Sequence, residues 1–211
     1  RLPSAGDFSF SYAGHTFVGW SKTATDQYDL FPAGVSAWDI AEQGKAIVDL
    51  YAVWADAEGS TRTCPTTDPS IQLQIRLIDV DHLTCALERV ICAGDMPANW
   101  TIPDTANDGT KNWMIVMYDG TVADDLWAVT EVTIGQHVAE GAECLQEDDA
   151  TYTRSKILVP AANATYASIE GLLVSKDKKH LLAVPCGWDN AEHVLEIPEG
   201  IETVEAGACN A

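Results

Sequence analysis

Four tryptophans are the side chains whose type and placement point most directly to ligand recognition. Each lies in or beside a stretch that reads as a loop, and tryptophan is enriched at the centres of protein interfaces. Its flat apolar ring can also stack on a sugar. The competing interpretation is that these rings fill gaps in an irregular core. The candidate ligand contacts are Trp100, Trp113, Trp127 and Trp188.

One acidic segment, residues 104–109 (DTANDG), has the beginning of a calcium-binding loop. A loop of this type also needs an oxygen ligand at its third position and a bidentate carboxylate at its twelfth. Those positions hold Ala106 and Ile115. We therefore expect neither a calcium site here nor a cofactor elsewhere in the chain.

The sequence carries no recognisable catalytic motif. It has no G-x-S-x-G nucleophile elbow and no phosphate-binding glycine loop. Each histidine stands alone, which is typical of surface histidines and of histidines satisfied within a core. Paired carboxylates for glycoside hydrolysis leave no local pattern, so that chemistry stays open as an alternative. We expect a non-enzymatic protein. The five histidines are His15, His82, His137, His180 and His193.

The six cysteines lack the spacing of a zinc site, because none forms a CxxC pair. Their even number permits three disulfides in an exported protein, and the alternative is burial as small apolar side chains. We expect burial for Cys92, Cys144 and Cys209. Cys64 lies in a Thr/Pro-rich segment and is the strongest candidate for a disulfide. The full set is Cys64, Cys85, Cys92, Cys144, Cys186 and Cys209.

Composition limits the classes of partner. The 211 residues include 32 acidic and 12 basic side chains, for a formal net charge of −20. A nucleic acid needs a basic surface, and an anionic membrane surface needs one too. With 46% hydrophobic residues the chain can form ordinary cores, and no apolar run is long enough to cross a bilayer. Neither nucleic acid nor direct membrane insertion is expected.

Two aromatic segments near the beginning read as β-strands. Residues 14–20 (GHTFVGW) and 50–54 (LYAVW) alternate aromatic and small residues, and each ends on a tryptophan. A short helix is predicted over residues 33–43. Residues 56–70 are rich in Gly, Ser, Thr, Pro and Asp, which favours a linker over 59–70.

The remainder reads as short strands between irregular stretches. Apolar residues alternate in LERVIC (87–92), VTEVTI (129–134), KILVP (156–160) and VLEIP (194–198), as on one buried strand face. Units of this kind must stack to bury that face. Residues 171–175 and 180–185 predict a hairpin with a polar turn, and residues 113–118 predict a strand that closes on a tight turn.

The first part resembles the internalin B-repeat family, also called the Listeria–Bacteroides repeat. That family pairs a glycine-aromatic-F-x-G-W strand with a later L-Y-A-x-W strand. His15 stands where the family more often has an aromatic residue, and the family's usual first strand is missing. The resemblance implies a partial β-grasp-like module, residues 1–58, of a secreted or surface-anchored bacterial protein. The matching residues are Gly14, Phe17, Gly19, Trp20, Leu50, Tyr51, Ala52 and Trp54.

Residues 155–211 resemble BspA-type leucine-rich repeats, more weakly extended towards residue 71. Cys209 stands where that family usually has Phe. The resemblance implies an irregular repeat array, residues 71–211, on a bacterial cell surface. The matching residues are Tyr166, Ser168, Gly171, Leu173, Ser175, Lys176, Asp177, Leu181, Pro185, Ile197, Pro198, Gly200, Ile201, Val204 and Ala208.

These patterns predict a β-rich α+β fold, in which a small β-grasp-like module precedes an irregular leucine-rich-repeat solenoid with β-hairpin insertions. The expected function is adhesion or protein–protein interaction through the repeat surface, at an extracellular or cell-surface location. The alternative is a carbohydrate-binding module that uses the loop tryptophans. The partner is then a host or microbial surface protein, or a glycan. Oligomeric state and disulfide pairing stay open.

Overall fold

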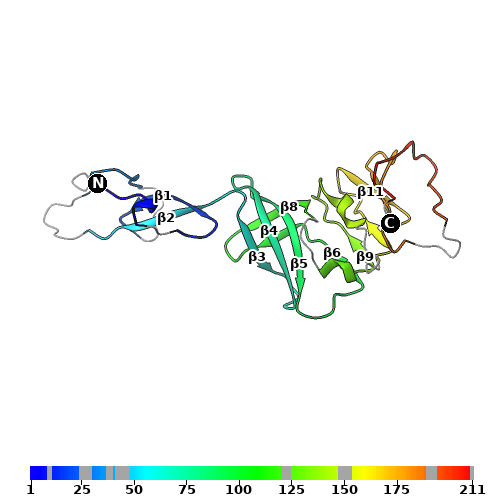
Figure 1. Cartoon of the computed structure of the whole chain (residues 1–211), viewed down its shortest axis with the longest axis horizontal. Coiled ribbons are helices and arrows are strands. Elements are labelled where there is room, and N and C mark those ends of the chain that lie inside the picture. Colours follow the sequence, from blue (N-terminus) through cyan, green and yellow to red (C-terminus); the bar gives the residue numbers. More distant parts are fainter. Residues whose placement is uncertain are drawn as a thin grey trace. The chain divides into compact units, whose positions relative to one another are not determined.

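The computed structural model describes residues 1–8, 11–23, 30–36, 40, 48–119, 125–146, 154–188 and 194–209. These divide into two compact units, Arg1–Ser60 and Thr61–Ala211. Strands dominate both units (Figure 1), which confirms the β-rich prediction. Three short 3-10 helices accompany them, namely η1 (Ala5–Phe8), η2 (Asp125–Ala128) and η3 (Ala142–Gln146). The helix predicted over 33–43 lies mostly outside the described residues.

The first unit contains the two strands predicted from the aromatic segments. β1 (His15–Ser21) pairs antiparallel with β2 (Tyr51–Asp56), with a shift of register between Phe17 and Gly19. The Phe17 ring meets Trp20 and Trp54 edge-on, at centroid distances of 5.4 and 5.5 Å. The indole N–H of Trp20 donates to the Pro3 carbonyl at 2.8 Å. Aromatic packing therefore stabilises this small unit.

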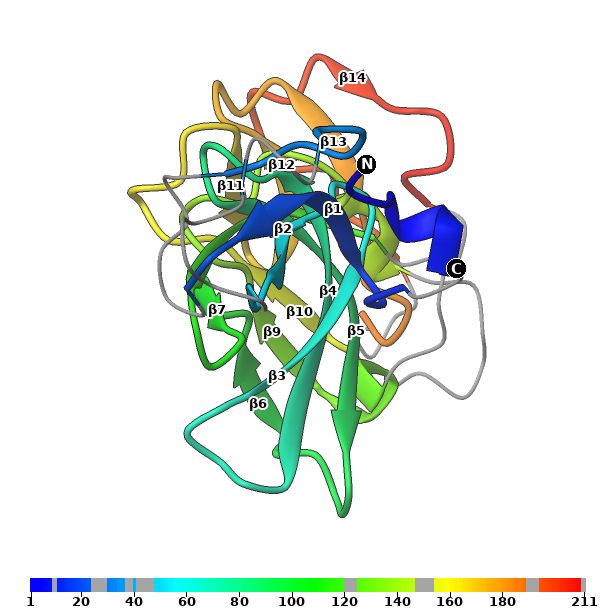
Figure 2. The same cartoon turned by 90° about the vertical axis from the view of Figure 1, so that its left-hand side faces the viewer.

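A five-stranded sheet begins the second unit, in the order β3-β4-β5-β8-β7 (Figures 1 and 2). The β5–β8 pair is parallel and the other pairs are antiparallel. In β4, Ile71, Leu73, Ile75 and Leu77 alternate with more exposed residues and are buried, so one face covers the core. The outer strands β3 and β7 have Cα atoms within 8 Å of one another. The sheet therefore curls until its two edges meet. Its strands are β3 (Thr61–Pro65), β4 (Ile71–Asp79), β5 (Thr84–Cys92), β7 (Thr105–Asn107) and β8 (Asn112–Tyr118).

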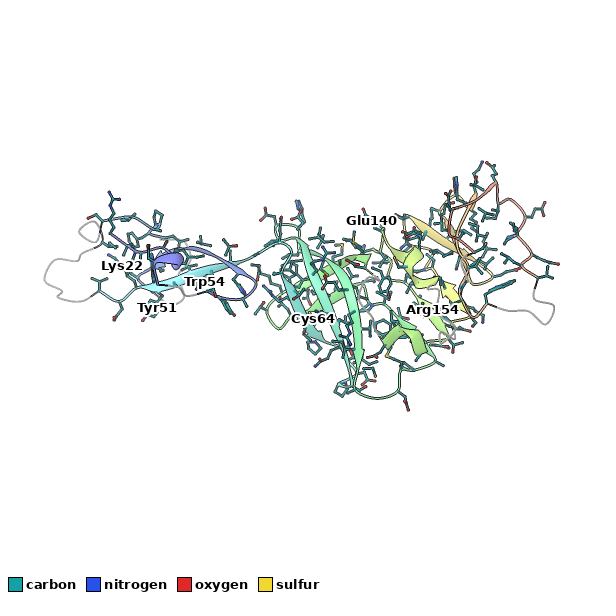
Figure 3. The ribbon with its side chains drawn as sticks, viewed as in Figure 1. Lys22, Tyr51, Trp54, Cys64, Glu140 and Arg154 are labelled. Carbon is teal, nitrogen blue, oxygen red and sulfur yellow. The ribbon has the colours of Figure 1, made fainter. Side chains whose placement is uncertain are left out.

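The prediction of a linker over 59–70 is wrong, because part of this segment is a strand of the sheet. Residues 61–65 form β3, which pairs with β4 from Thr61↔Arg76 to Pro65↔Gln72. Cys64, in the middle of β3, is fully buried (Figure 3). Backbone pairing with β4 and the burial of one side chain hold a Thr/Pro-rich stretch in a strand that its composition alone does not predict.

Three short parallel strands form a second sheet, which we call the strand ladder. Its order is β10-β9-β6, with β6 (Asn99–Thr101), β9 (Glu131–Thr133) and β10 (Lys156–Leu158). The middle residues align as Trp100↔Val132↔Ile157. Val132 and Ile157 are fully buried. The two segments predicted at 129–134 and 156–160 are thus neighbours in one sheet, whereas 87–92 belongs to β5 and 194–198 lies outside the strands.

The last sheet has the order β11-β12-β13-β14. The predicted hairpin at 171–185 is confirmed by β12 and β13, which pair antiparallel through Leu173↔Ala183 and Val174↔Leu181. β14 adds in parallel beside β13. The strands are β11 (Tyr166–Ile169), β12 (Leu172–Ser175), β13 (His180–Ala183) and β14 (Thr203–Val204).

Two buried polar side chains connect these elements. Arg154 is 1% exposed (Figure 3), and its guanidinium donates to the carbonyls of Leu145 in η3 and Leu126 in η2. One buried side chain therefore connects η2 to η3.

The second buried polar side chain, Asn163, is also 1% exposed. Its amide N donates to the carbonyls of Gly135 and Val138, at 3.1 and 2.8 Å. Its amide O accepts from the backbone N–H groups of Thr165 and Tyr166, at 2.9 and 2.8 Å. One side chain therefore links the loop after β9 to the beginning of β11, with its amide fully used.

All six cysteines are free thiols in the structure. Cys64 and Cys85 are fully buried, and burial is the main reason that their pKa values rise to about 11 and about 12. The expectation of burial is wrong for Cys144 and Cys209, which are exposed. Cys92 is partly buried. Cys64 behaves as a small core side chain because its strand turns it inward.

Candidate ligand-binding site

Trp113 is a core residue, so its prediction as a ligand contact is wrong. It is fully buried in β8, on the same face as Ile115. Its indole N–H donates to the Asp108 carboxylate at 2.7 Å, and the Lys111 ammonium lies 5.5 Å from the ring centroid. Alternation along β8 directs the ring inward, and the partner carboxylate satisfies its one polar atom.

Trp188 and Trp127 give no support for a ligand site. Trp188 is partly buried and packs on a small apolar cluster that includes Leu172, Val174 and Leu181. For Trp127 the backbone belongs to η2, but its side chain lies outside what the structure describes.

Trp100 is the predicted tryptophan that the structure places beside a cleft. The cleft has a volume of about 360 Å³ and opens between the loop after β3 and strand β7. The curl of the five-stranded sheet, which brings these two edges together, creates it. Trp100 itself is partly buried and packs against the main core cluster, so one side of the ring is fixed while the ring still lines the cleft.

The loop after β3 supplies polar groups that its own hydrogen bonds hold in place. Thr66 donates its hydroxyl to the Ile71 carbonyl at 3.0 Å. One carboxylate oxygen of Asp68 accepts from the backbone N–H and the hydroxyl of Ser70, at 2.9 and 2.7 Å. These bonds lower the pKa of Asp68 below its usual value of 3.8. The carboxylate is therefore ionised at neutral pH, and its other oxygen remains available as an acceptor.

Further polar groups on residues that line the cleft have no protein partner within the described part of the chain. They are the Trp100 indole N–H and the hydroxyls of Thr67, Thr101 and Thr105. Asn107 also lines the cleft. Its amide oxygen accepts from Gly109 N, and its amide nitrogen donates to Asn112. Pro65 and Pro103 add rigid apolar surface. No Lys, Arg or His is among the described residues that line this cleft.

The calcium-like segment, residues 104–109, uses its oxygens on protein donors. Asp108 accepts from Thr110, from the Lys111 backbone N–H and from the Trp113 indole. Partial burial alone would raise the pKa of Asp108, but these bonds outweigh it and lower the pKa to about 2. One oxygen of Asp104 accepts from Gln136 N at 2.7 Å. Over the described ranges, no group of three or more His, Cys, Asp and Glu is arranged to hold a metal ion.

The strand ladder presents an outward face next to the cleft, because Thr101 belongs to both. Side chains on either side of the middle residues Trp100, Val132 and Ile157 point outward and align in two rows. Lys156 and Glu131 form an ion pair at 2.6 Å within this face. The outward face consists of Asn99, Thr101, Glu131, Thr133, Lys156 and Leu158.

Comparison with known proteins assigns no family. No protein-family model matches the chain, and no curated protein does. Among solved structures, the chain is similar to the crystal structure of the pneumococcal vaccine antigen PcpA, with 11% sequence identity and a TM-score of 0.26. The match covers 72% of this chain and 62% of the antigen, which is less than two thirds of that chain.

Among the described residues, no helix is both long and apolar enough to span a bilayer.

The arrangement around Trp100 can bind a small polar group or a segment of a larger ligand. Its free donors and acceptors are hydroxyls, one indole N–H and one carboxylate oxygen. These groups suit recognition by hydrogen bonding and ring packing.

Proposed function

We propose that this chain is a non-enzymatic recognition protein, secreted or on a bacterial cell surface, and that it binds another protein through the outward face of the strand ladder. In this proposal residues 1–58 form a β-grasp-like spacer module and residues 71–211 form an irregular leucine-rich-repeat array. The sequence resemblances support both assignments. The partner is a host or microbial surface protein.

The observation that carries the proposal is the in-register parallel pairing of three short strands. The strands align Asn99↔Glu131↔Lys156 and Thr101↔Thr133↔Leu158, so their outward side chains form two continuous rows. Backbone bonds fix these rows before any ligand arrives, which lowers the entropic cost of binding. Extended surfaces of stacked repeats commonly serve as binding faces.

The chemistry of the outward face suits a protein partner. Thr133, in the middle strand, and Leu158, at one end of its row, are half-buried, whereas Asn99 and Lys156 are exposed. Interfaces between proteins commonly combine apolar and polar side chains. A stable interface covers about 800 Å² on each partner, so the contact must extend beyond the ladder onto neighbouring loops.

The net charge of −20 adds a kinetic expectation. A basic partner would be steered towards the chain, and its association would slow as salt screens the charges. The outward face itself is close to neutral, because Lys156 and Glu131 pair with one another. Salt is therefore expected to change the association rate more than the dissociation rate.

The test is binding to an immobilised panel of purified extracellular-matrix and serum proteins, measured by surface plasmon resonance. Thr133→Arg places a long charged side chain in the centre of the outward face. Thr203→Arg makes the same change on the exposed strand β14 and is the matched control. We expect saturable binding to at least one protein, weakened about tenfold or more by Thr133→Arg and unchanged by Thr203→Arg. Absence of binding to the whole panel, or equal affinities for both variants, would contradict the proposal.

A further inference from the structure

We propose that the cleft beside Trp100 is a binding site for a neutral carbohydrate, next to the protein contact on the strand ladder, with which it shares Thr101. The inference depends on the side chains that line the cleft and on their hydrogen-bond partners. It goes beyond the proposed function because it assigns a second ligand of a different class.

The Trp100 ring provides the packing surface. It is held on one side by the main core cluster and lines the cleft on another. A sugar ring presents a face of C–H groups that packs on a flat aromatic surface. Because Trp100 is already fixed by its neighbours, little side-chain entropy is lost when a ligand stacks on it. Its indole N–H, which has no acceptor within the described part of the chain, adds a donor at the ring edge.

The polar groups of the cleft match a polyhydroxylated ligand. The hydroxyls of Thr67, Thr101 and Thr105 can each donate one hydrogen bond and accept others. The free oxygen of Asp68 accepts only, and a bond to an ionised acceptor is stronger than one between neutral groups. Sugar hydroxyls can both donate and accept, so they can satisfy all of these groups at once.

The same lining disfavours other classes of small ligand. An anion would meet no cationic side chain among the described lining residues, in a chain of net charge −20. A metal ion would find one carboxylate, Asp68, with one of its oxygens already used by Ser70. An apolar ligand would bury hydroxyls without partners, which costs free energy.

A proline-rich peptide is the strongest competing ligand. Such peptides bind grooves lined by several aromatic side chains. Trp100 is the one aromatic residue among the described residues that line this cleft, and hydroxyl groups are the commonest polar groups around it. The lining therefore favours a sugar over a polyproline helix.

The volume of about 360 Å³ sets the size of the bound part. It lies near the lower end of the range of about 300–1,000 Å³ that is typical of small-molecule sites. The cleft is open to solvent, so a short part of a longer oligosaccharide can occupy it while the rest remains outside.

The experiment is isothermal titration of the folded chain with neutral oligosaccharides of glucose, galactose, mannose and N-acetylglucosamine. Trp100→Ala removes the packing surface, and Trp100→Phe retains an aromatic ring. Thr105→Val removes one cleft hydroxyl with little change of shape, and Thr203→Val makes the same change on β14 as the matched control. Circular dichroism and the unfolding midpoint of each variant show whether it is folded.

We expect at least one oligosaccharide to bind with a Kd of about 1 mM or lower. Trp100→Ala should weaken it about tenfold or more, Trp100→Phe should restore part of the affinity, and Thr105→Val should weaken it several-fold. Thr203→Val should leave it unchanged. The proposal is overturned if no oligosaccharide binds at about 10 mM, if folded Trp100→Ala binds as well as the unaltered chain, or if only proline-rich peptides bind.

Discussion

Replacing Gly141 with alanine should destabilise the second unit through one backbone contact. Gly141 has a φ of +79°, and a Cβ added there would overlap the carbonyl oxygen of Tyr118 and lie 2.9 Å from its carbonyl carbon. Tyr118 is 2% exposed at the end of β8. Neither backbone can move away cheaply, because Tyr118 N donates to the Glu140 carbonyl at 3.0 Å and Ala139 N donates to the Val116 carbonyl at 2.8 Å.

The expected magnitude follows from these contacts. A left-handed conformation costs a residue with a Cβ about 1–2 kcal/mol. Relief of the overlap would lengthen the two backbone hydrogen bonds, each worth about 0.5–1.5 kcal/mol. The sum is about 3 kcal/mol, a large part of the stability of a typical domain. For a unit of this size it corresponds to a fall in Tm of about 6–12 °C.

Gly200→Ala is the matched control. Gly200 has a φ of +96° in the same unit, but nothing lies within 4 Å of an added Cβ. This variant should lose only the conformational part, about 1–2 kcal/mol. Urea unfolding followed by far-UV circular dichroism gives both free energies. If Gly141→Ala is no less stable than Gly200→Ala, the steric reasoning is refuted.

Three further predictions test the interior of the second unit. The lowered pKa of Asp108, about 2 against an ordinary 3.8, contributes stability that is present above pH 4 and is lost as the pH falls towards 2. After allowance for solvent screening this contribution amounts to about 1–2 kcal/mol. Asp108→Asn should therefore flatten the dependence of unfolding free energy on pH. Equal pH dependence in the variant and the unaltered chain would contradict this prediction. Iodoacetamide at pH 8 should label exposed Cys144 in the native chain but spare buried Cys64 until urea is added, whereas equal labelling rates would contradict the burial. Asn163→Ala should lower the unfolding free energy by about 3 kcal/mol, because three buried backbone groups and the partly buried N–H of Thr165 lose their partner; an unchanged urea midpoint would disprove that role.

Local sequence patterns were sufficient to predict those elements whose structure is determined by neighbouring residues. The aromatic alternation around Phe17 and Trp54 predicted β1 and β2, and these strands are present. The apolar segments on either side of Lys176 predicted the β12–β13 hairpin, which is also present. In each case the alternation of residue types along a few positions predicts the strands. For the hairpin, the polar turn between them adds to this prediction.

Contacts between distant segments explain what the sequence did not predict. Composition favours a linker around Cys64, but β4 supplies the backbone partners that make the segment a strand. Cys144 lies next to apolar residues in the sequence and is nevertheless exposed, because η3 directs Ala142 and Leu145 inward instead. Burial of this kind depends on which face a neighbouring element covers.

For the candidate site, too, the local sequence predicted part of the result and contacts between distant segments determined the rest. Residue type correctly drew attention to tryptophans, but it did not distinguish Trp100 from Trp113. The two differ because β8 buries Trp113 between the sheet and Asp108, whereas Trp100 lies where the curled sheet brings its two edges together. The threonines of the cleft come from separate segments and carry no motif that would have marked them.

The central proposal, protein recognition through the strand ladder, is tested most directly by mapping the contact itself. The ¹⁵N-labelled chain would be titrated with the matrix or serum protein that it retains most tightly, and backbone amide resonances followed by NMR. The largest changes are expected at Asn99–Thr101, Glu131–Thr133 and Lys156–Leu158. Changes confined to Arg1–Ser60, or no protein retained at all, would contradict it.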